Sequence, residues 1–114
     1  MTRINHLEIL ECVKQQKPIV CIDVRESFRT RTFDAGGLKM QYDKIPDYSE
    51  VLSLYNTPDR IVVVCCFNDP SGRANKAEKA LRKLGFEDIR ILEKGLWHGW
   101  YQKVGAKVKL PFEV

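Results

Sequence analysis

The chain has 114 residues, of which 44% are hydrophobic and 30% are charged, and its formal net charge is +4. This composition is typical of a globular protein, and it excludes a disordered chain. The length allows one domain and is too short for two ordinary ones, so we predict a single domain over residues 1–114. Because lysines and arginines are spread along the chain, we expect no nucleic-acid partner, although a weak preference for anionic ligands fits the charge.

The amino-terminal stretch MTRINHLEIL lacks the apolar core of a signal peptide, and no apolar run approaches membrane-spanning length. We therefore expect an intracellular, cytoplasmic protein with no membrane partner. The sequence does not indicate an oligomeric state.

The apolar pattern alternates between strand-like and helix-like segments. The chain begins with a short extended start at Ile4, a helix of about ten residues from Asn5 towards Pro18 and a strand over 19–23. A short helical segment through Phe28 and Phe33 then stops at Gly36-Gly37, and it is followed by a brief strand at Leu38 and Met40 and by a helix over 47–55 with caps at Asp47 and Ser49. The last four segments are a strand over 61–65, a helix from about 71 to 84, a strand over 89–92 and a helix over 96–104. This alternation predicts an α/β fold with an open, mainly parallel sheet and helices on both faces.

The stretch from Ile61 to Leu84 is the one on which the function should centre. An apolar, β-branched strand ends in two adjacent cysteines, Cys65 and Cys66, and a short loop then leads into a helix. In parallel sheets, ligands bind beyond the carboxyl ends of the strands. The backbone N–H groups of such a loop, together with the start of the helix, favour an anion or a thiolate.

The other two cysteines, Cys12 and Cys21, lie within apolar patterns and are expected to be small core residues. The four cysteines lack the paired spacing of a zinc site, and the chain has only two histidines. We therefore predict no metal site.

Four segments in the right order resemble the rhodanese-like family across nearly the whole chain. These are Ile22-Asp23-Val24-Arg25-Glu26, the strand 61–66 followed by Gly72-Arg73-Ala74, the segment 84–92 (LGFEDIRIL), and Gly95 with Trp100. The resemblance implies a rhodanese-like fold and a thiosulfate-sulfurtransferase-like activity, in which a cysteine carries sulfane sulfur as a persulfide.

Matched residue by residue, the resemblance makes Cys66 the nucleophile and Arg73 the basic residue of the loop. Cys65 takes the place that the family usually gives to an aromatic or apolar residue, and as an adjacent cysteine it is also a candidate second thiol. The resemblance places the substrate anion against Phe67, Asn68, Ser71, Gly72 and Arg73, above an ion-paired structural corner of Asp23, Arg25 and Glu26. It implies no cofactor, and its partners would be a small anionic sulfur donor and a thiol or protein sulfur acceptor.

The loop departs from the family pattern, because Arg73 stands seven positions after Cys66 where most sulfurtransferases have five. The added residues bring Asp69-Pro70, which predicts a helix start with Asp69 as its cap. A carboxylate close to the thiolate would raise the thiol's pKa. A catalytically inactive rhodanese-like binding module is therefore the main alternative, and a cysteine-dependent phosphatase or arsenate reductase is a weaker one, because no basic residue stands between Cys66 and Arg73.

The carboxyl-terminal aromatic residues fit a packing role better than a catalytic one. Trp97, Trp100 and Tyr101 are expected to fill the core and its rim, and His98 is expected at the surface.

Overall fold

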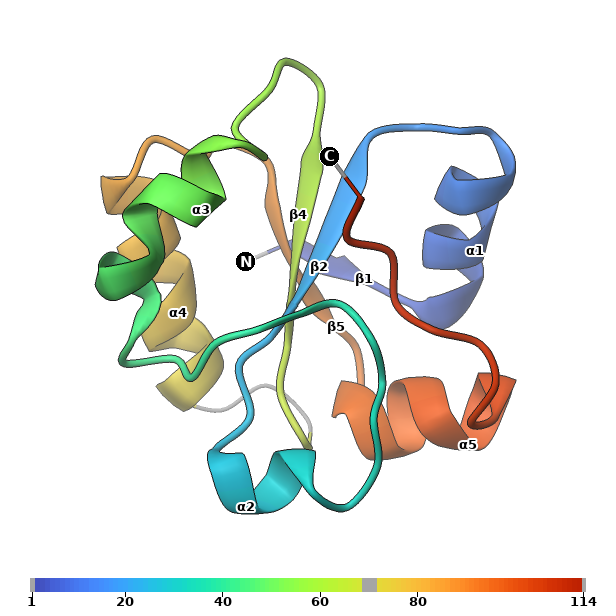
Figure 1. Cartoon of the computed structure of the whole chain (residues 1–114). Coiled ribbons are helices and arrows are strands. Elements are labelled where there is room, and N and C mark those ends of the chain that lie inside the picture. Colours follow the sequence, from blue (N-terminus) through green and yellow to red (C-terminus); the bar gives the residue numbers. More distant parts are fainter. Residues whose placement is uncertain (1, 69–71, 114) are drawn as a thin grey trace.

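The computed structural model describes residues 2–68 and 72–113, and its centre is a five-stranded, all-parallel sheet with the strand order β1-β5-β4-β2-β3. The strands are β1 (Thr2–Ile4), β2 (Ile19–Asp23), β3 (Leu38–Lys39), β4 (Ile61–Cys65) and β5 (Ile89–Leu92), and the helical elements are α1 (His6–Lys14), α2 (Ser27–Thr30), η1 (Ile45–Tyr48), α3 (Ser49–Ser53), α4 (Gly72–Lys83), η2 (Trp97–Tyr101) and α5 (Gln102–Val104). The predicted α/β sheet is confirmed, and Figure 1 shows its helices on both sides.

The middle strands β2 and β4 are buried at every position, as their continuous apolar sequences predict. They pair in parallel from Ile19 opposite Ile61 to Asp23 opposite Cys65. The carboxyl ends of the two strands therefore lie side by side.

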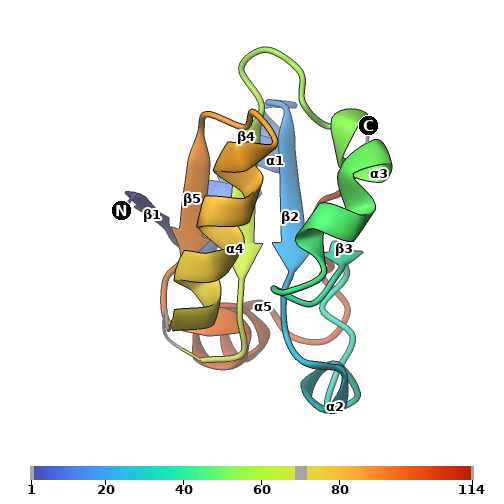
Figure 2. The same cartoon turned by 90° about the vertical axis from the view of Figure 1, so that its left-hand side faces the viewer.

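Two apolar layers enclose the sheet, one on each face. On one face, α3 and α4 cover a cluster that includes Leu52, Ala77 and Leu81, and Figure 2 looks onto this side. On the other face, α1 and η2 cover a cluster that includes Ile9 and Trp100. Cys12 and Cys21 belong to this second cluster, which confirms that they are core residues.

Local signals fix the ends of two helices where the sequence predicts them. The Asn5 side chain accepts from the Glu8 N–H, and the Glu8 carboxylate accepts from the Asn5 N–H, so a capping box begins α1. Gly85, at a φ of +99°, follows the end of α4 in the left-handed conformation that glycine adopts without strain.

Three predicted segments differ from the structure. The helix expected over 47–55 is a 3₁₀ turn, η1, continued by α3, and the structure records no side-chain cap at either start. The segment expected to be helical through Phe33 ends as α2 at Thr30, because the Arg25 guanidinium binds the carbonyl oxygens of Arg29 and Phe33 and turns the chain. The helix expected over 96–104 is present, since the chain is helical from 95 to 104, but residues 97–101 form a π-helical turn, η2, before the short α5.

The helix predicted from about residue 71 begins, within the described residues, at Gly72, and the predicted Asp69-Pro70 start lies outside the described residues. Across 2–68 and 72–113, no helix combines the length and the apolar character needed to cross a bilayer.

Candidate functional site at the carboxyl ends of β2 and β4

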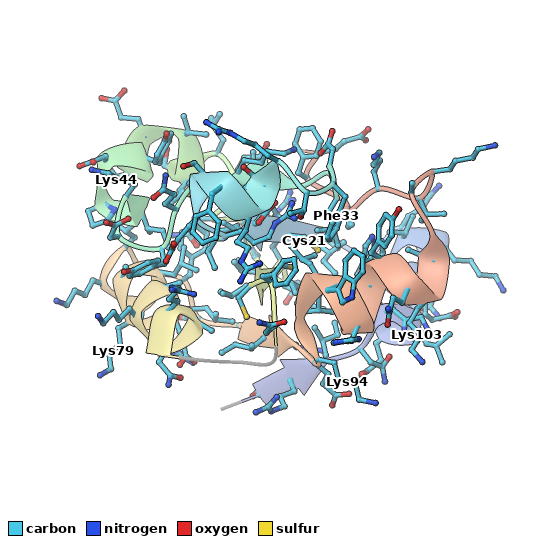
Figure 3. The ribbon with its side chains drawn as sticks, turned by 90° about the horizontal axis from the view of Figure 1, so that it is seen from below. Cys21, Phe33, Lys44, Lys79, Lys94 and Lys103 are labelled. Atoms are coloured by element: carbon cyan, nitrogen blue, oxygen red, sulfur yellow. The ribbon has the colours of Figure 1, made fainter. Side chains whose placement is uncertain are left out.

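The strand order changes direction between β2 and β4, because β2 continues to β3 on one side and the chain then returns to β4 on the other. A change of direction of this kind opens a crevice at the carboxyl ends of the two strands, where α/β proteins bind ligands. Cys66 is the first residue after β4, so the chain brings a thiol to this crevice. Figure 3 views this end of the sheet, with Cys21 near its centre and Lys44, Lys79, Lys94 and Lys103 around it.

The Cys66 side chain is almost covered, with an exposed fraction of 5%, and packs with the core cluster under α4. Its thiol donates a hydrogen bond to the carbonyl oxygen of Asn68, with 2.8 Å between sulfur and oxygen. A carbonyl oxygen only accepts hydrogen bonds, so this contact is one that the thiol can make and the thiolate cannot.

The first residues of the loop are fixed from the other side by the start of η2. The N–H groups of Leu96 and Trp97 donate to the carbonyl oxygens of Cys66 and Phe67, at 2.7 Å and 3.1 Å. Gly95 has a φ of +68°, and a Cβ at this position would overlap the backbone of Phe67 and Asn68. The close contact between the loop and Gly95 therefore depends on glycine.

Cys65 lies in a different environment from its neighbour. It is fully buried among the residues covered by α1 and η2, and its thiol contacts the Val63 carbonyl oxygen at 3.8 Å. Burial, and then the neighbouring Cys21 thiol, raise the pKa of Cys65 well above its usual value. The two adjacent thiols thus point into opposite core clusters, and Cys65 has the properties of a core residue.

Arg73 lies in the first turn of α4, and its guanidinium forms an ion pair with the Glu26 carboxylate at 2.6 Å. The two side chains are 52% and 28% exposed, so solvent screens this pair. The sequence led us to expect Glu26 in the corner beneath the loop, whereas the structure joins it to the expected anion-binding arginine.

Asp23 and Arg25 form the predicted corner at the end of β2. Both are buried, and the guanidinium donates to both carboxylate oxygens, with a shortest distance of 2.6 Å. Arg25 also stacks on the Phe33 ring, at 4.5 Å from its centre. This pair fixes the position of the chain between β2 and α2 beside the crevice.

A row of side chains that the sequence analysis did not place together runs past the loop. We call Phe28, Arg29, Phe67, Trp97 and Tyr101 the arginine–aromatic row. The Arg29 guanidinium lies 5.1 Å from the Phe28 ring centre and 4.5 Å from that of Phe67. Phe67 stacks with Trp97 at 6.2 Å, and Trp97 stacks with Tyr101 at 5.2 Å. The available signal was the position of Phe28-Arg29, shortly after the end of the strand beside β4.

The remaining predicted positions are placed as follows. Asn68 and Gly72 are both exposed. Asp69 and Ser71 lie outside the described residues. Trp100 is buried and Trp97 and Tyr101 are half-buried, as predicted for core and rim. His98 is exposed and contacts the Gln102 side chain at 2.8 Å.

No family model matches this chain, and the search of curated protein sequences finds no match. Solved structures do match. The single-domain sulfurtransferase RDL2 of Saccharomyces cerevisiae superimposes with a TM-score of 0.67 at 20% identity, over 95% of this chain and 94% of that one. A rhodanese-like domain protein of Staphylococcus aureus gives 0.68 at 22% identity over 100% of both chains.

A third similar structure has a different description. A Rhodopseudomonas palustris protein of unknown function, described as a possible tyrosine phosphatase, superimposes with a TM-score of 0.66 at 17% identity, over 99% of this chain and 85% of that one. At these identities the similarity concerns the fold and leaves the reaction open. The parallel sheet, the crevice between β2 and β4 and these superpositions together show that the chain has a rhodanese-like fold.

Proposed function

We propose that this protein is a sulfurtransferase that carries sulfane sulfur as a persulfide on Cys66. The observation that carries the proposal is the position of Cys66, directly after β4 and at the crevice between the two middle strands. The similarity to structures described as single-domain sulfurtransferases supports the same reaction class.

The reaction needs two displacements at sulfur. Cys66 first loses its proton, and the thiolate attacks the outer sulfur of thiosulfate, so that an S–S bond forms to Cys66 while the S–S bond of thiosulfate breaks. Sulfite leaves with the electron pair. A nucleophile such as cyanide or a thiolate then attacks the outer sulfur of the persulfide, and the Cys66 thiolate leaves.

The donor and the persulfide are anions, so the site must supply hydrogen-bond donors and positive charge. We assign this role to the backbone N–H groups of the loop, at Phe67, Asn68, Ser71 and Gly72, and to Arg73. Arg73 would have to share its guanidinium between Glu26 and the substrate, or exchange one for the other. The thiol would also have to leave the Asn68 carbonyl oxygen, which cannot donate to a thiolate.

These two requirements favour a second candidate, a catalytically inactive rhodanese-like binding module. Its support is specific: the Cys66 sulfur is nearly covered and bonded to a carbonyl oxygen, and Arg73 is paired with Glu26. A phosphatase has weaker support, because its basis is one structural neighbour of 17% identity and the sequence between Cys66 and Arg73 lacks a basic residue.

The deciding experiment incubates the protein with thiosulfate and cyanide, follows thiocyanate, and weighs the intact protein after incubation with thiosulfate alone. We expect turnover and the mass of one added sulfur atom, both lost in Cys66→Ser and retained in Cys65→Ser. If the wild-type protein forms no thiocyanate and gains no mass, sulfur transfer is refuted and the binding module remains as the proposed function.

Two further measurements distinguish the alternatives. A phosphatase would release phenol from an aryl phosphate and lose this activity in Cys66→Ser. The pH dependence of Cys66 alkylation gives the pKa of its thiol, and a value at or above about 8.5, that of an ordinary cysteine, would argue for the inactive module.

A further inference from the structure

The arginine–aromatic row defined above has the composition of a protein interface. Arginine and aromatic residues are enriched at interface centres, and this row combines four rings with one guanidinium that contacts two of them. Phe28 is 54% exposed, and the other four members are half-buried. The row is therefore open to a partner and already held in place by its own contacts.

Contacts within the row reduce the cost of binding. Arg29 is stacked against Phe67, and Phe67 and Trp97 are stacked against each other, so few side-chain rotations remain to be lost when a partner arrives. The row also crosses three separate parts of the chain: α2, the Cys66 loop and η2. A partner lying on it would contact all three.

Several positively charged side chains lie at this end of the sheet. Lys44, Lys79, Lys94 and Lys103 are exposed around this end of the sheet in Figure 3, and Arg29 lies in the row itself. Two carboxylates on either side of α2 in the sequence, those of Glu26 and Asp34, form ion pairs with Arg73 and Lys39 respectively. A partner that brings negative charge would therefore be attracted to this end.

We propose that the arginine–aromatic row is the docking surface for an acidic, extended segment of a partner protein, with apolar side chains against the ring edges and carboxylates facing Arg29 and the lysines. A single-stranded nucleic acid fits less well, since stacked bases need open ring faces. Here the face of Phe67 carries Arg29, and Trp97 lies parallel to two other rings. This inference goes beyond sulfur transfer and requires no chemistry at Cys66.

Phe67 gives docking a direct connection to the thiol, because it belongs to the row and is the residue after Cys66. Its carbonyl oxygen is held by Trp97, another member of the row. A segment that displaces either ring would act on the backbone that carries Cys66.

The test uses a fluorescein-labelled peptide of about twelve residues that repeats Asp-Leu-Asp-Gly, which extends about 40 Å and can cross this 33 Å molecule. Fluorescence anisotropy at about 150 mM salt measures its binding to the full chain. We expect binding of this peptide, none of the version with lysine in place of aspartate, and weaker binding of the version with glycine in place of leucine.

Matched variants locate the binding. Arg29→Gln and Phe28→Ser should each weaken it by about fivefold or more. Arg60→Gln is the control, because Arg60 also stacks on a ring, that of Tyr55 at 5.5 Å, but precedes β4 and so lies at the opposite end of the sheet. It removes the same charge and should change binding less than about twofold.

The Trp97 indole N–H signal should shift in the NMR spectrum of the wild-type protein when the acidic peptide is added. Three results would overturn the proposal: no binding of the acidic peptide, equal weakening by Arg29→Gln and Arg60→Gln, or tighter Arg29-dependent binding of an oligouridylate than of the peptide. Each is independent of thiocyanate formation, so failure of docking and failure of sulfur transfer remain distinguishable.

Discussion

The N–H of Leu96 donates to the carbonyl oxygen of Cys66 at 2.7 Å, and this bond joins the candidate nucleophile to a segment thirty positions further along the chain. The next N–H, that of Trp97, holds the next carbonyl oxygen, that of Phe67. With two carbonyl groups committed to η2, the shape of the Cys66 loop depends on the turn at Lys94 and Gly95 as much as on its own sequence. Both residues have positive φ values, of 61° and 68°.

Gly95→Ala tests this dependence. The new Cβ would be strained by the positive φ and would overlap the backbone of Phe67 and Asn68. We expect a loss of about 1–3 kcal/mol in the free energy of unfolding in urea, together with changed fluorescence of Trp97. Gly72→Ala is the control, since a Cβ at Gly72 meets nothing within 4 Å, and it should change stability by less than about 0.5 kcal/mol. Equal stabilities of the two variants would contradict this account of the loop.

The buried Asp23–Arg25 pair has an exposed counterpart with the same spacing, Asp88–Arg90. Asp23→Ala would leave Arg25 charged, 2% exposed and without its carboxylate, and should cost about 3–5 kcal/mol of unfolding free energy. Asp88→Ala removes the same side chain from a solvent-screened pair and should cost less than about 1 kcal/mol. Urea unfolding monitored by circular dichroism compares the stabilities of the two variants. Similar losses would mean that burial does not determine how much the Asp23–Arg25 pair contributes to stability.

The sequence predicted well what depends on continuous local patterns. The β-branched runs at 19–23 and 61–65 specify buried parallel strands, and with their alternating helices they led directly to the fold. The ion-paired corner of Asp23 and Arg25 was also predicted, whereas its complete burial was not.

Contacts between distant segments could not be predicted in this way. The stacking of Arg29 on Phe67 joins residues 38 positions apart, and the pairing of Glu26 with Arg73 joins two side chains to which the sequence analysis gave separate roles. The end of α2 at Thr30 is set by the Arg25 guanidinium and not by a Gly or Pro signal. Such features depend on which strand ends meet, and the apolar pattern does not encode this.

Glu26→Gln tests the role of Arg73. If Arg73 binds the sulfur donor, removal of the Glu26 charge should lower the KM for thiosulfate about two- to fivefold, in line with the ~0.5–1 kcal/mol of an exposed pair. Glu78→Gln is the control, because Glu78 pairs with Arg82 near the far end of α4 and the variant has the same net charge. Arg73→Gln should raise KM. An unchanged KM in both Glu26→Gln and Arg73→Gln would remove Arg73 from the binding site.

Asp34 makes the stability depend on pH. Its bond to the Lys39 ammonium, at 2.7 Å, and the N–H of Gly36 lower its pKa from 3.8 to about 2. Because the folded state has the lower pKa, this stabilisation is present above about pH 4 and is lost as pH falls towards 2. Asp34 is largely exposed, so Asp34→Asn should cost less than about 1 kcal/mol at pH 7. In urea titrations, the difference from wild type should shrink between pH 4 and pH 2. A difference that stays constant over this range would contradict the assignment.

The two adjacent thiols should differ in reactivity. Cys65 is fully buried with a raised pKa, whereas Cys66 is 5% exposed at the end of the strand. Brief treatment with iodoacetamide at pH 8 should therefore modify the native Cys65→Ser variant faster than the native Cys66→Ser variant, by about tenfold or more. Mass spectra of the peptide that contains residues 65 and 66 follow the rate, so that modification of Cys12, which is 8% exposed, is not counted. The same treatment in denaturant should modify both variants alike because burial is then lost. Equal rates in the native proteins would show that the different burial of the two thiols does not affect their reactivity. The difference in exposure would then be no reason to prefer Cys66 as the nucleophile.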